Sequence, residues 1–392
     1  MQPLQGITVV SLEQAVAAPL ATRHLADLGA RVIKVERPDG GDFARAYDSG
    51  VRGMASHFVW LNRGKESLTL NLKHPEGRDI LARLVAGADV FLQNLAPGST
   101  DRLGFDAATL TDRHPRLVVC DMSGYGATGP YRDKRAYDLL VQSETALVSV
   151  TGTPEHPSKT GVPAADIGAG MYAFSTVLAA LLLRERTGRG TALEITMFDA
   201  LTEWMGHPLY LTQHTGKEPP RVGLSHPIIA PYDAYPTGDG GQVVIGIQND
   251  REWVRLATHV LERPELATDP EFATNQARVR NRARVDAAVT EGLAKLAREE
   301  AVDRLEEAGI ANARLRGVHE LIDHDQLVAR DRWREIDSPV GRLPTVLPPM
   351  NFAGTDPALG PVPDLGEHTE PILSGLGYAD VDVARLRDEQ VI

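Results

Sequence analysis

Residues 7–35 read ITVVSLEQAVAAPLATRHLADLGARVIKV and contain a β-branched run, a helical pattern and a second β-branched run. The two runs, Ile7–Leu12 and Arg31–Val35, have the composition of buried strands. Between them, Pro19–Gly29 has helical spacing and closes on a glycine. This order predicts a right-handed crossover between two parallel strands, and therefore an α/β fold.

The same alternation continues along the chain, which predicts a doubly wound parallel sheet covered by helices on both faces. The further predicted elements are a helix at Pro75–Ala86, a strand at Val90–Leu92, a helix at Asp106–His114, a strand at Leu117–Met122, a long helix from Ile167 to about Arg186, a strand at Thr191–Met197 and a helix at Phe198–Gln213.

The composition changes after residue 213. Residues 214–231 are rich in Gly, Pro and His and are predicted to form a linker. Residues 232–330 contain a hairpin with a Gly-rich turn and then charged helices, predicted at 250–261, 276–298 and 300–308. We therefore expect a large domain in residues 1–213 and a smaller α+β domain in residues 232–330. Residues 331–392 include a Pro-rich stretch and a short helix near Val381–Asp388.

The charge of the chain excludes several classes of partner. It has 392 residues and a net charge of −12, from 41 Lys and Arg against 53 Asp and Glu. Proteins that bind nucleic acid or anionic membranes normally carry a basic surface.

The longest strongly apolar stretch, within Met171–Leu183, is predicted to be too short for a bilayer, which needs about 20 residues. The N-terminus has no signal-peptide pattern, so we expect a cytoplasmic enzyme with no nucleic-acid or membrane partner.

Three common site motifs are absent or incomplete. The stretch Gly124–Gly129 matches G-x-G-x-x-G, but no helical pattern follows it, and a dinucleotide site needs that helix. The single cysteine, Cys120, lies in an apolar run and is predicted to be a buried structural thiol. No H-x-x-x-H or H-E-x-x-H pattern and no G-x-S-x-G elbow occurs, so we predict no metal site and no serine nucleophile.

Asp166 has two interpretations from the residues alone. It stands where a loop meets the long apolar helix, and Asp is a favoured helix N-cap. The small residues Gly168, Ala169 and Gly170 weaken the first turn, however, and leave space beside the carboxylate for a substrate carbonyl. Capping and catalysis therefore both remain open at this point.

Several basic residues are predicted at or just beyond strand ends, where open parallel sheets bind their ligands. They are Arg37, Lys73, Arg102, Lys134 and Arg135. Each by itself is typical of a solvated surface charge. Together they are suited to the phosphates of a polyanionic small molecule, against the acidic balance of the whole chain.

The chain resembles the family III CoA-transferases (the CaiB/BaiF family, which includes formyl-CoA transferases and α-methylacyl-CoA racemases) over nearly its whole length. The matching segments are Leu4–Ser11 with Gln14 and Ala18-Pro19, Leu28–Arg37 with Gly41-Asp42, Asn94–Gly98 with Arg102–Phe105, Ser123–Gly126, Ala136–Asp138, Thr187–Thr191 and Leu365–Thr369.

The resemblance implies a large domain built from both ends of the chain, so that residues 331–392 return to it, and an interlocked homodimer. It makes Asp166 the nucleophile, forming a mixed anhydride and then an aspartyl-CoA thioester, with Gln14 orienting the acyl group. It implies no permanently bound cofactor, because CoA enters as a thioester substrate. The family's CoA contacts match Arg37, Leu72, Lys73, Asn94, Leu95, Arg102, Arg135 and Tyr137. The family's glycine-rich lid matches Gly238, Gly240 and Gly241, although Asp239 interrupts the glycine run here.

Two alternatives differ from CoA transfer. A racemase of the same family needs a His before an Asp, and this chain has Tyr137-Asp138, where a phenol of ordinary pKa near 10 is a poor base. A non-catalytic acyl-CoA-binding protein is the other. Further similarity favours succinyl-CoA as donor and a small dicarboxylic acid as acceptor, with Arg45, Arg52 and Arg63 as candidates for pairing a distal carboxylate.

Overall fold

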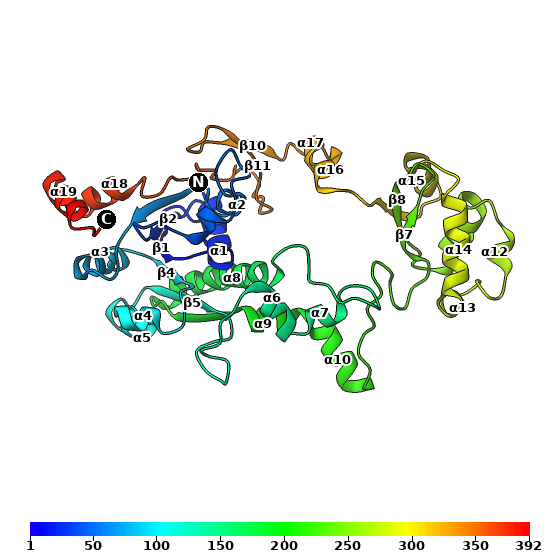
Figure 1. The fold of residues 1–392 in the computed structure, drawn as a ribbon, viewed down its shortest axis with the longest axis horizontal. Helices are drawn as coiled ribbons and strands as arrows, with labels where there is room; N and C mark the ends of the chain where they lie inside the picture. The colour runs from blue at the N-terminus through cyan, green and yellow to red at the C-terminus, as the bar shows by residue number, and fades with distance from the viewer. The chain divides into compact units, whose positions relative to one another are not determined.

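Six parallel strands form the central sheet in the computed structural model, which describes residues 1–392 (Figure 1). The strands lie in the order β3-β2-β1-β4-β5-β6, so the chain reverses its direction of winding between β1 and β4. The strand bounds are Thr8–Leu12 for β1, Arg31–Glu36 for β2, Lys65–Thr69 for β3, Val90–Gln93 for β4, Val118–Ser123 for β5 and Ala192–Thr196 for β6. The predicted doubly wound α/β fold is confirmed.

This sheet belongs to the larger of two units, which comprises Met1–Leu147, Lys159–Leu209 and Asp331–Ile392. Its helices are α1 (Ala17–Asp27), η1 (Phe43–Ala46), α2 (Ser56–Asn62), α3 (Pro75–Ala86), α4 (Ser99–Leu103), α5 (Ala107–Arg113), α6 (Asp138–Glu144), α8 (Ala164–Thr187), α9 (Met197–Trp204), α18 (Thr369–Gly375) and α19 (Asp380–Asp388). A small antiparallel pair, β10 (Trp333–Ile336) and β11 (Leu343–Val346), completes it.

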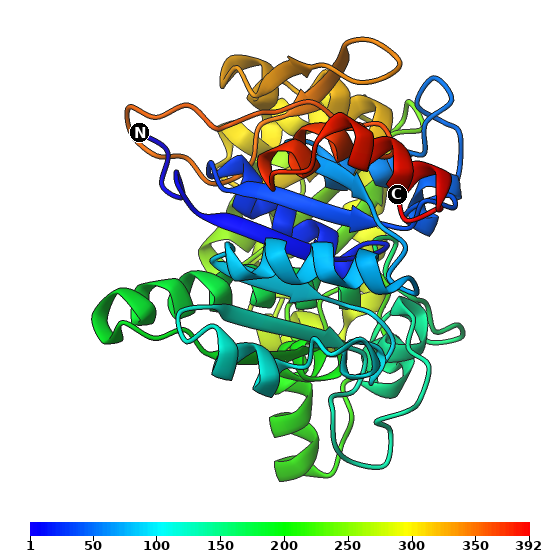
Figure 2. The ribbon, with the colours of Figure 1, turned by 90° about the vertical axis from the view of Figure 1, so that its left-hand side faces the viewer.

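Both faces of the sheet are buried, as the apolar strands require. Val9 and Val32 point to the face covered by α1 and α8, whereas the neighbouring Val10 and Ile33 point to the opposite face. On that second face α3 packs together with α18 and α19, which bring the C-terminal segment beside β3 (Figure 2). The last residues of the chain thereby become part of the sheet's core.

The second unit comprises Val148–Ser158 and Tyr210–Arg330 and has its own core around Trp253 and Val289. Its three-stranded antiparallel sheet consists of β7 (Tyr232–Pro236), β8 (Gln242–Gly246) and β9 (Ala311–Arg314). Its helices are α11 (Asp250–Arg255), the π-helix Leu256–Val260, α12 (Glu265–Thr268), α13 (Asn275–Arg280), α14 (Arg282–Leu293), α15 (Arg298–Glu307), α16 (Val318–Ile322) and α17 (Asp325–Ala329). Two helices, α7 (Leu147–Val150) and α10 (Gly206–Thr215), begin in the first unit and end in the second.

Some predicted elements were wrong in extent. The single helix expected at Phe198–Gln213 is two helices, α9 and α10, which break at Met205 before Gly206. The helix expected at 276–298 divides at Asn281 into α13 and α14. Strand β3 was not predicted, because its sequence KESLT carries charged residues in place of an apolar run.

Helix α8 is longer than the apolar stretch at its centre. The helix has 24 residues and a mean hydropathy of 1.6 in its most apolar window, which is enough by length and composition to cross a membrane. The expectation that this segment is too short to span a bilayer was therefore wrong. Small residues such as Ala164 and Ala165 extend the helix towards its N-terminus. Core helices of other folds pass the same test, and here Ala173 and Val177 are fully buried in the core against α1 and the sheet.

A glycine sets the distance between α1 and α8. A Cβ at Gly170 would lie 2.6 Å from the carbonyl oxygen of Ala17 and 3.1 Å from Cβ of Leu20. The two backbones therefore approach more closely than any side chain would permit.

Gly170→Ala is expected to lower the free energy of unfolding by about 1–3 kcal/mol, because the methyl group must push two packed helices apart. Gly206→Ala is the matched control, since a Cβ at Gly206 meets nothing within 4 Å. Urea unfolding of both variants measures the effect. Equal midpoints for the two would contradict the close packing described here.

Candidate active site

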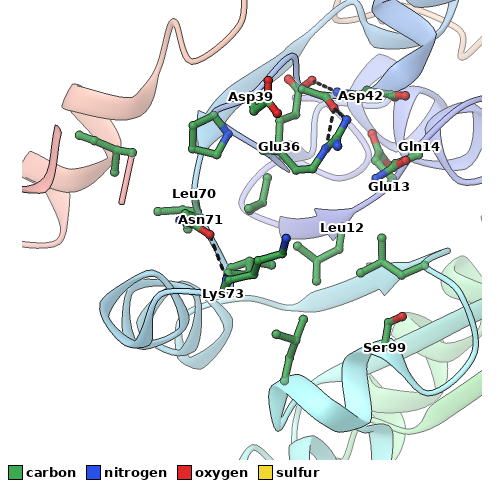
Figure 3. Close-up of a pocket in the computed structure, with 18 of the residues that line it drawn as sticks. Leu12, Glu13, Gln14, Glu36, Asp39, Asp42, Leu70, Asn71, Lys73 and Ser99 are labelled. Carbon is green, nitrogen blue, oxygen red and sulfur yellow. Dashed lines mark hydrogen bonds between the residues drawn. The ribbon is translucent and has the colours of Figure 1, made fainter. Parts of the chain in front are cut away.

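A cavity of about 780 Å³ opens at the carboxyl ends of β1, β2 and β3, next to the start of the segment after β4. It therefore lies at the point where the strand order reverses, the usual ligand site of an open parallel sheet. Figure 3 shows the residues that converge on it. The lining residues are Leu12, Glu13, Gln14, Val35, Glu36, Arg37, Pro38, Asp39, Gly41, Asp42, Leu70, Asn71, Leu72, Lys73, Leu95, Ser99, Arg102, Leu103, Arg387, Gln390 and Ile392.

The structure brings most of the expected CoA residues to this one cavity. Those that line it are Arg37, Leu72, Lys73, Leu95 and Arg102. Gln14, which was expected to orient the acyl group, lines it as well. Asn94 stands directly behind: its Oδ1 accepts the amide of Gln14 and its Nδ2 donates to the carbonyl of Gln14, each at 2.9 Å. Arg135 and Tyr137 do not line the cavity; both are exposed, in the segment that leads into α6.

Three of the four cations that line the cavity have no carboxylate partner, and the fourth, Arg387, pairs with Glu370. Arg37 donates to the carbonyl of Gly41 at 3.0 Å, Arg102 donates to Oγ of Ser99 at 3.0 Å, and Lys73 is exposed. None of the three forms an ion pair, although acidic residues outnumber basic ones in this chain. Their positive charge is therefore available to an anionic ligand.

Asp166 occupies the first turn of α8, but it is not the helix cap. The N-cap is Pro163, whose side chain caps nothing, so the capping interpretation of Asp166 is wrong. The carboxylate of Asp138 takes over that task from α6, since its Oδ1 accepts the amide of Ala165 at 2.8 Å. Asp166 is thus free of a structural role in its own helix.

The surroundings of Asp166 raise its pKa to about 7, first through burial and then through the negative charge of Asp138. A hydrogen bond from the amide of Ala17, in the first turn of α1, lowers the pKa but does not offset these two effects. One helix N-terminal amide is therefore not enough to keep the pKa of this carboxyl at its ordinary value. Tyr47 also lies within electrostatic reach, because Asp42 and Asp166 help burial to raise the pKa of its phenol to about 12.

The small residues after Asp166 serve helix packing. A Cβ at Gly168 would lie 3.2 Å from the ring of Trp204, and Gly170 contacts α1 as described above. Neighbouring side chains and backbone thus already occupy the space at these two glycines, and the expectation of room for a substrate carbonyl beside Asp166 stays a prediction.

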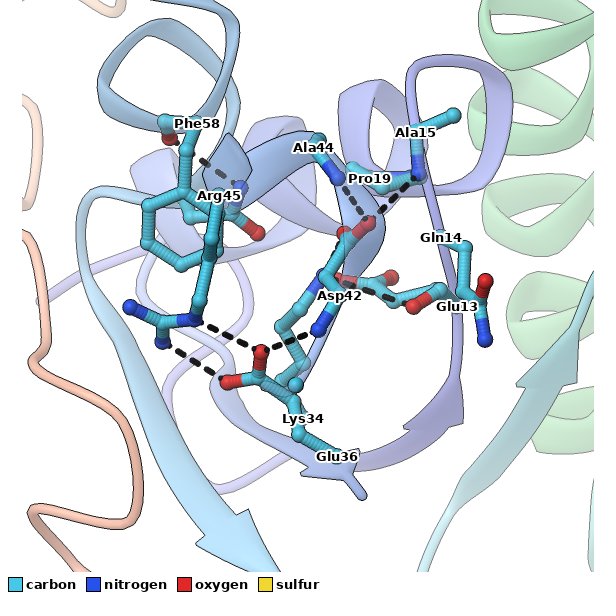
Figure 4. Close-up of polar contacts among 12 residues, drawn as sticks. Glu13, Gln14, Ala15, Pro19, Lys34, Glu36, Asp42, Ala44, Arg45 and Phe58 are labelled. Carbon is cyan, nitrogen blue, oxygen red and sulfur yellow. Dashed lines mark hydrogen bonds and ion pairs between the residues drawn. The ribbon is translucent and has the colours of Figure 1, made fainter. Parts of the chain in front are cut away.

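A buried ionic network fixes the segment that connects the cavity to Asp166 (Figure 4). Glu13 accepts hydrogen bonds from Nζ of Lys65 and from Oγ1 of Thr22, both at 2.6 Å. Lys34 donates to Oδ2 of Asp42 at 2.7 Å and lies 3.6 Å from Oε1 of Glu13. Two carboxylates and two ammonium groups thus neutralise one another, and the lysine and Glu13 side chains are fully buried.

Asp42 also holds the backbone of the connecting segment. Its Oδ1 accepts the amide of Ala15 at 3.1 Å and the amide of Ala44 at 2.9 Å. Ala15 has a φ of 63°, a left-handed conformation that costs a residue with a side chain about 1 kcal/mol or more. The carboxylate stabilises this turn, which sends Gln14 to the cavity and the amide of Ala17 to Asp166.

The network residues were missed by sequence reasoning, and two expected arginines belong to the scaffold. Arg45 pairs with Glu36 at 2.8 Å and Arg63 pairs with Asp27 at 2.9 Å, so neither is available for a substrate carboxylate. Arg52 is hydrogen-bonded to the carbonyl of Arg342 at 3.2 Å. Charged residues inside a predicted strand, such as Lys34, were the one available signal of a buried network.

The predictions for Cys120 and the glycine motif hold. Cys120 is fully buried, and burial raises the pKa of its thiol to about 12, which makes it inert. No helix opens on Gly124–Gly129, since α6 begins at Asp138. A Cβ at Gly124 would lie 2.1 Å from that of Ala136, so this glycine permits close packing of the loop.

The Gly238–Gly241 turn joins β7 to β8 in the second unit. Asp239 fastens it: its carboxylate accepts Oγ1 of Thr237 at 2.7 Å and the amide of Arg298 at 3.0 Å, which holds its pKa at about 2. A Cβ at Gly238 would lie 2.6 Å from a backbone carbonyl. The residue that interrupts the glycine run is therefore an anchor of the turn. The role of Gly238, Gly240 and Gly241 as a lid stays a prediction.

Asp166 does not itself line the cavity, but the segment Gln14–Ala17 connects the two. A buried carboxyl of raised pKa and a cavity with unpaired cations are both features of a functional site. The chain matches the model of CoA-transferase family III over residues 4–369. It is 38% identical to the acetyl-CoA:oxalate CoA-transferase of Acetobacter aceti, covering 84% of this chain and 85% of that protein. It is 33% identical to the succinate–glutarate CoA-transferase of Agrobacterium fabrum, covering 95% and 96%.

Solved structures agree with the sequence comparison. A CaiB/BaiF family protein from Brucella suis superimposes with a TM-score of 0.87 at 36% identity, covering 96% of this chain and 99% of that one. The chain belongs to CoA-transferase family III and is a CoA-transferase.

Lys34→Met is expected to lower the free energy of unfolding by about 3–5 kcal/mol, because Asp42 would be left buried without its ammonium partner and Glu13 would keep only Lys65. Arg31→Met on the same strand is the control. Its bidentate bond to Glu66 is exposed, and such pairs contribute about 1 kcal/mol or less. Chemical unfolding monitored by circular dichroism compares them. Equal losses would contradict a stabilising role for the network.

Asp166→Asn is expected to be more stable than the wild type, by a margin that grows between pH 5 and pH 8. The carboxyl has a pKa of about 7 when folded and an ordinary value of 3.8 when unfolded, so the native state holds its proton longer. Wild-type stability therefore falls as the pH rises towards 7, and Asn removes this loss. The gain should increase by about 2 kcal/mol across that range, measured by thermal unfolding. A margin independent of pH would contradict the raised pKa.

Proposed function

We propose that the protein transfers CoA from succinyl-CoA to a small dicarboxylic acid, with Asp166 as the nucleophile. The observation that carries the proposal is the segment Gln14–Ala17, whose first residue lines the cavity and whose last donates its amide to Asp166. A thioester bound in the cavity would therefore reach the carboxylate. Relatives support the substrates: similar proteins are named for succinate and glutarate, and for succinyl-CoA and D-citramalate.

A carboxylate nucleophile suits this reaction because the energy of the thioester must be kept. Asp166 attacks the carbonyl carbon of succinyl-CoA and CoA thiolate leaves, which forms a mixed anhydride. The thiolate then attacks the aspartyl carbonyl of this anhydride. Succinate leaves, and an aspartyl-CoA thioester remains. The acceptor carboxylate attacks this thioester and expels CoA thiolate, which finally attacks the acceptor acyl carbon and restores Asp166. A serine would lose this energy at the first step, because it would form an oxygen ester, and it has no carbonyl carbon that could carry CoA.

The cavity is suited to the nucleotide part of CoA. Arg37, Lys73 and Arg102 offer unpaired positive charge to its phosphates, and Leu72 and Leu95 offer apolar surface. Gln14, fixed by two hydrogen bonds to Asn94, stands at the catalytic end, where its amide would orient the acyl group.

We also propose a cytoplasmic homodimer with interlocked chains. One side of α8 carries exposed Met171, Tyr172, Leu182 and Leu183, an apolar surface that a second chain would cover. Sedimentation of the purified protein measures the number of chains.

Asp166→Ala is expected to lower kcat about 1,000-fold or more, because the variant lacks the only group that carries CoA between the two acids. Transfer from succinyl-CoA to glutarate, citramalate, malate and oxalate is followed by chromatography. The wild type should also yield a CoA adduct on the peptide that contains Asp166, sensitive to hydroxylamine. A folded variant with near-normal transfer would refute the role of Asp166 as the nucleophile.

Since the carboxyl must be ionised to attack, wild-type kcat/KM should rise as the pH increases through about 7.

A further inference from the structure

The C-terminal segment forms one wall of the cavity. Val391 accepts the amide of Asn71 at 2.8 Å, and Gln390 accepts the side-chain amide of Asn71 at 3.2 Å. Both Val391 and Leu386 are fully buried in the core beneath. The last turn of α19 is thereby fixed next to the loop that supplies Leu72 and Lys73, and Arg387 joins the cavity lining.

Arg387 differs from its neighbour on the same helix. Arg385 is held by two carboxylates, those of Glu76 at 2.6 Å and Glu389 at 2.8 Å, and lies outside the cavity lining. Arg387 has one partner, Glu370, at 2.7 Å, and this pair is 59% and 64% exposed. An exposed ion pair contributes about 0.2–1 kcal/mol, so a doubly charged phosphate would displace Glu370 readily.

The charges of the cavity lining also leave a place for a fourth cation. Of the four acids in the lining, Glu13, Glu36 and Asp42 are buried and neutralised by lysines or Arg45. The fourth, Asp39, is exposed and forms no ion pair, so it adds a negative charge to the lining. Coenzyme A carries two charges on its diphosphate and about −1.5 to −2 more on its 3′-phosphate at neutral pH. Arg37, Lys73 and Arg102 balance roughly three of these.

The place of the C-terminal helix in the cavity wall indicates which phosphate of CoA lies near Arg387. The C-terminal helix lies beyond Leu70 and Asn71 in Figure 3, on the side of the cavity away from Gln14. The thioester and the 3′-phosphate are at opposite ends of an acyl-CoA molecule. A thioester held near Gln14 therefore directs the nucleotide towards α19.

We propose that Arg387 recognises the 3′-phosphate of CoA and releases Glu370 when the nucleotide binds. The proposal rests on the proposed function for the presence of CoA in this cavity. It makes the C-terminal helix the element that distinguishes CoA from carriers with the same pantetheine arm but no 3′-phosphate.

Isothermal titration of the full-length protein with CoA and with 3′-dephospho-CoA tests this without any need for transfer. Arg387→Ala should raise the Kd for CoA about tenfold, since one charge-assisted hydrogen bond is lost, and leave the Kd for 3′-dephospho-CoA unchanged. Glu370→Gln should lower the Kd for CoA about twofold, because Arg387 no longer has a competitor. Arg385→Ala removes the same charge two residues earlier and should change neither constant.

The other outcomes overturn the assignment. If Arg387→Ala weakens both ligands equally, the guanidinium contacts the diphosphate or acts by its general field. If it weakens neither, or if the wild type binds both ligands equally, Arg387 recognises no phosphate. Wild-type binding of CoA without transfer to any acid would refute the proposed function and leave this inference standing, so the two failures are distinguishable.

Discussion

The ionic network of Glu13, Lys34, Lys65 and Asp42 is the constraint on which the site depends. Neighbouring strands β2 and β3 place the two lysines two positions apart in register inside the unit, where isolated ammonium groups would be strongly destabilising. Each lysine donates a hydrogen bond to a carboxylate from a loop, Lys34 to Asp42 and Lys65 to Glu13. These bonds fix the two loops to the strands. Burial lowers the pKa of Lys65 to about 8 even with Glu13 in contact, which shows how much of the charge balance depends on that one carboxylate.

From this network the geometry of the catalytic end follows. Asp42 fixes the left-handed turn at Ala15, and the turn aims the N-terminus of α1 at Asp166. The N-terminus of α8 is occupied by Asp138 instead. Two carboxylates near two helix N-termini create the repulsion that, with burial, keeps Asp166 a weak acid. A carboxylate of raised pKa is a better nucleophile once it is ionised, and a pKa of about 7 leaves part of the carboxyl ionised at neutral pH.

Although the chain is acidic, several basic side chains that line the cavity have no carboxylate partner. Most arginines near the site are neutralised by carboxylates, including Arg45 and Arg63, whereas Arg37 and Arg102 bond to uncharged oxygens. A local positive site in an acidic protein concentrates an anionic ligand there and repels it elsewhere. The positive charge that the cavity offers therefore depends on which cations lack a carboxylate partner, and this is a property of the folded chain.

The sequence by itself determined the fold of the large unit and the residues of the cavity floor. Runs such as Ile7–Leu12 and Val90–Leu92 specify buried parallel strands, because only a sheet covered on both faces accepts continuous apolar residues. Gln14 and Arg37 follow two such strands, Ile7–Leu12 and Arg31–Val35, and the carboxyl ends of parallel strands meet at one edge. Local composition thus carried enough information.

Only the tertiary structure decided the state of Asp166 and the partners of the arginines. Asp138 and Ala17 lie 28 and 149 positions from Asp166 in the sequence, yet they set its pKa. Arg63 was a candidate for binding a carboxylate, but in the structure it pairs with Asp27. Arg387 lines the cavity because the C-terminal segment packs beside β3. Electrostatic interactions depend on distance in space and on exclusion of water, and neither quantity is encoded in the spacing of residues along the chain.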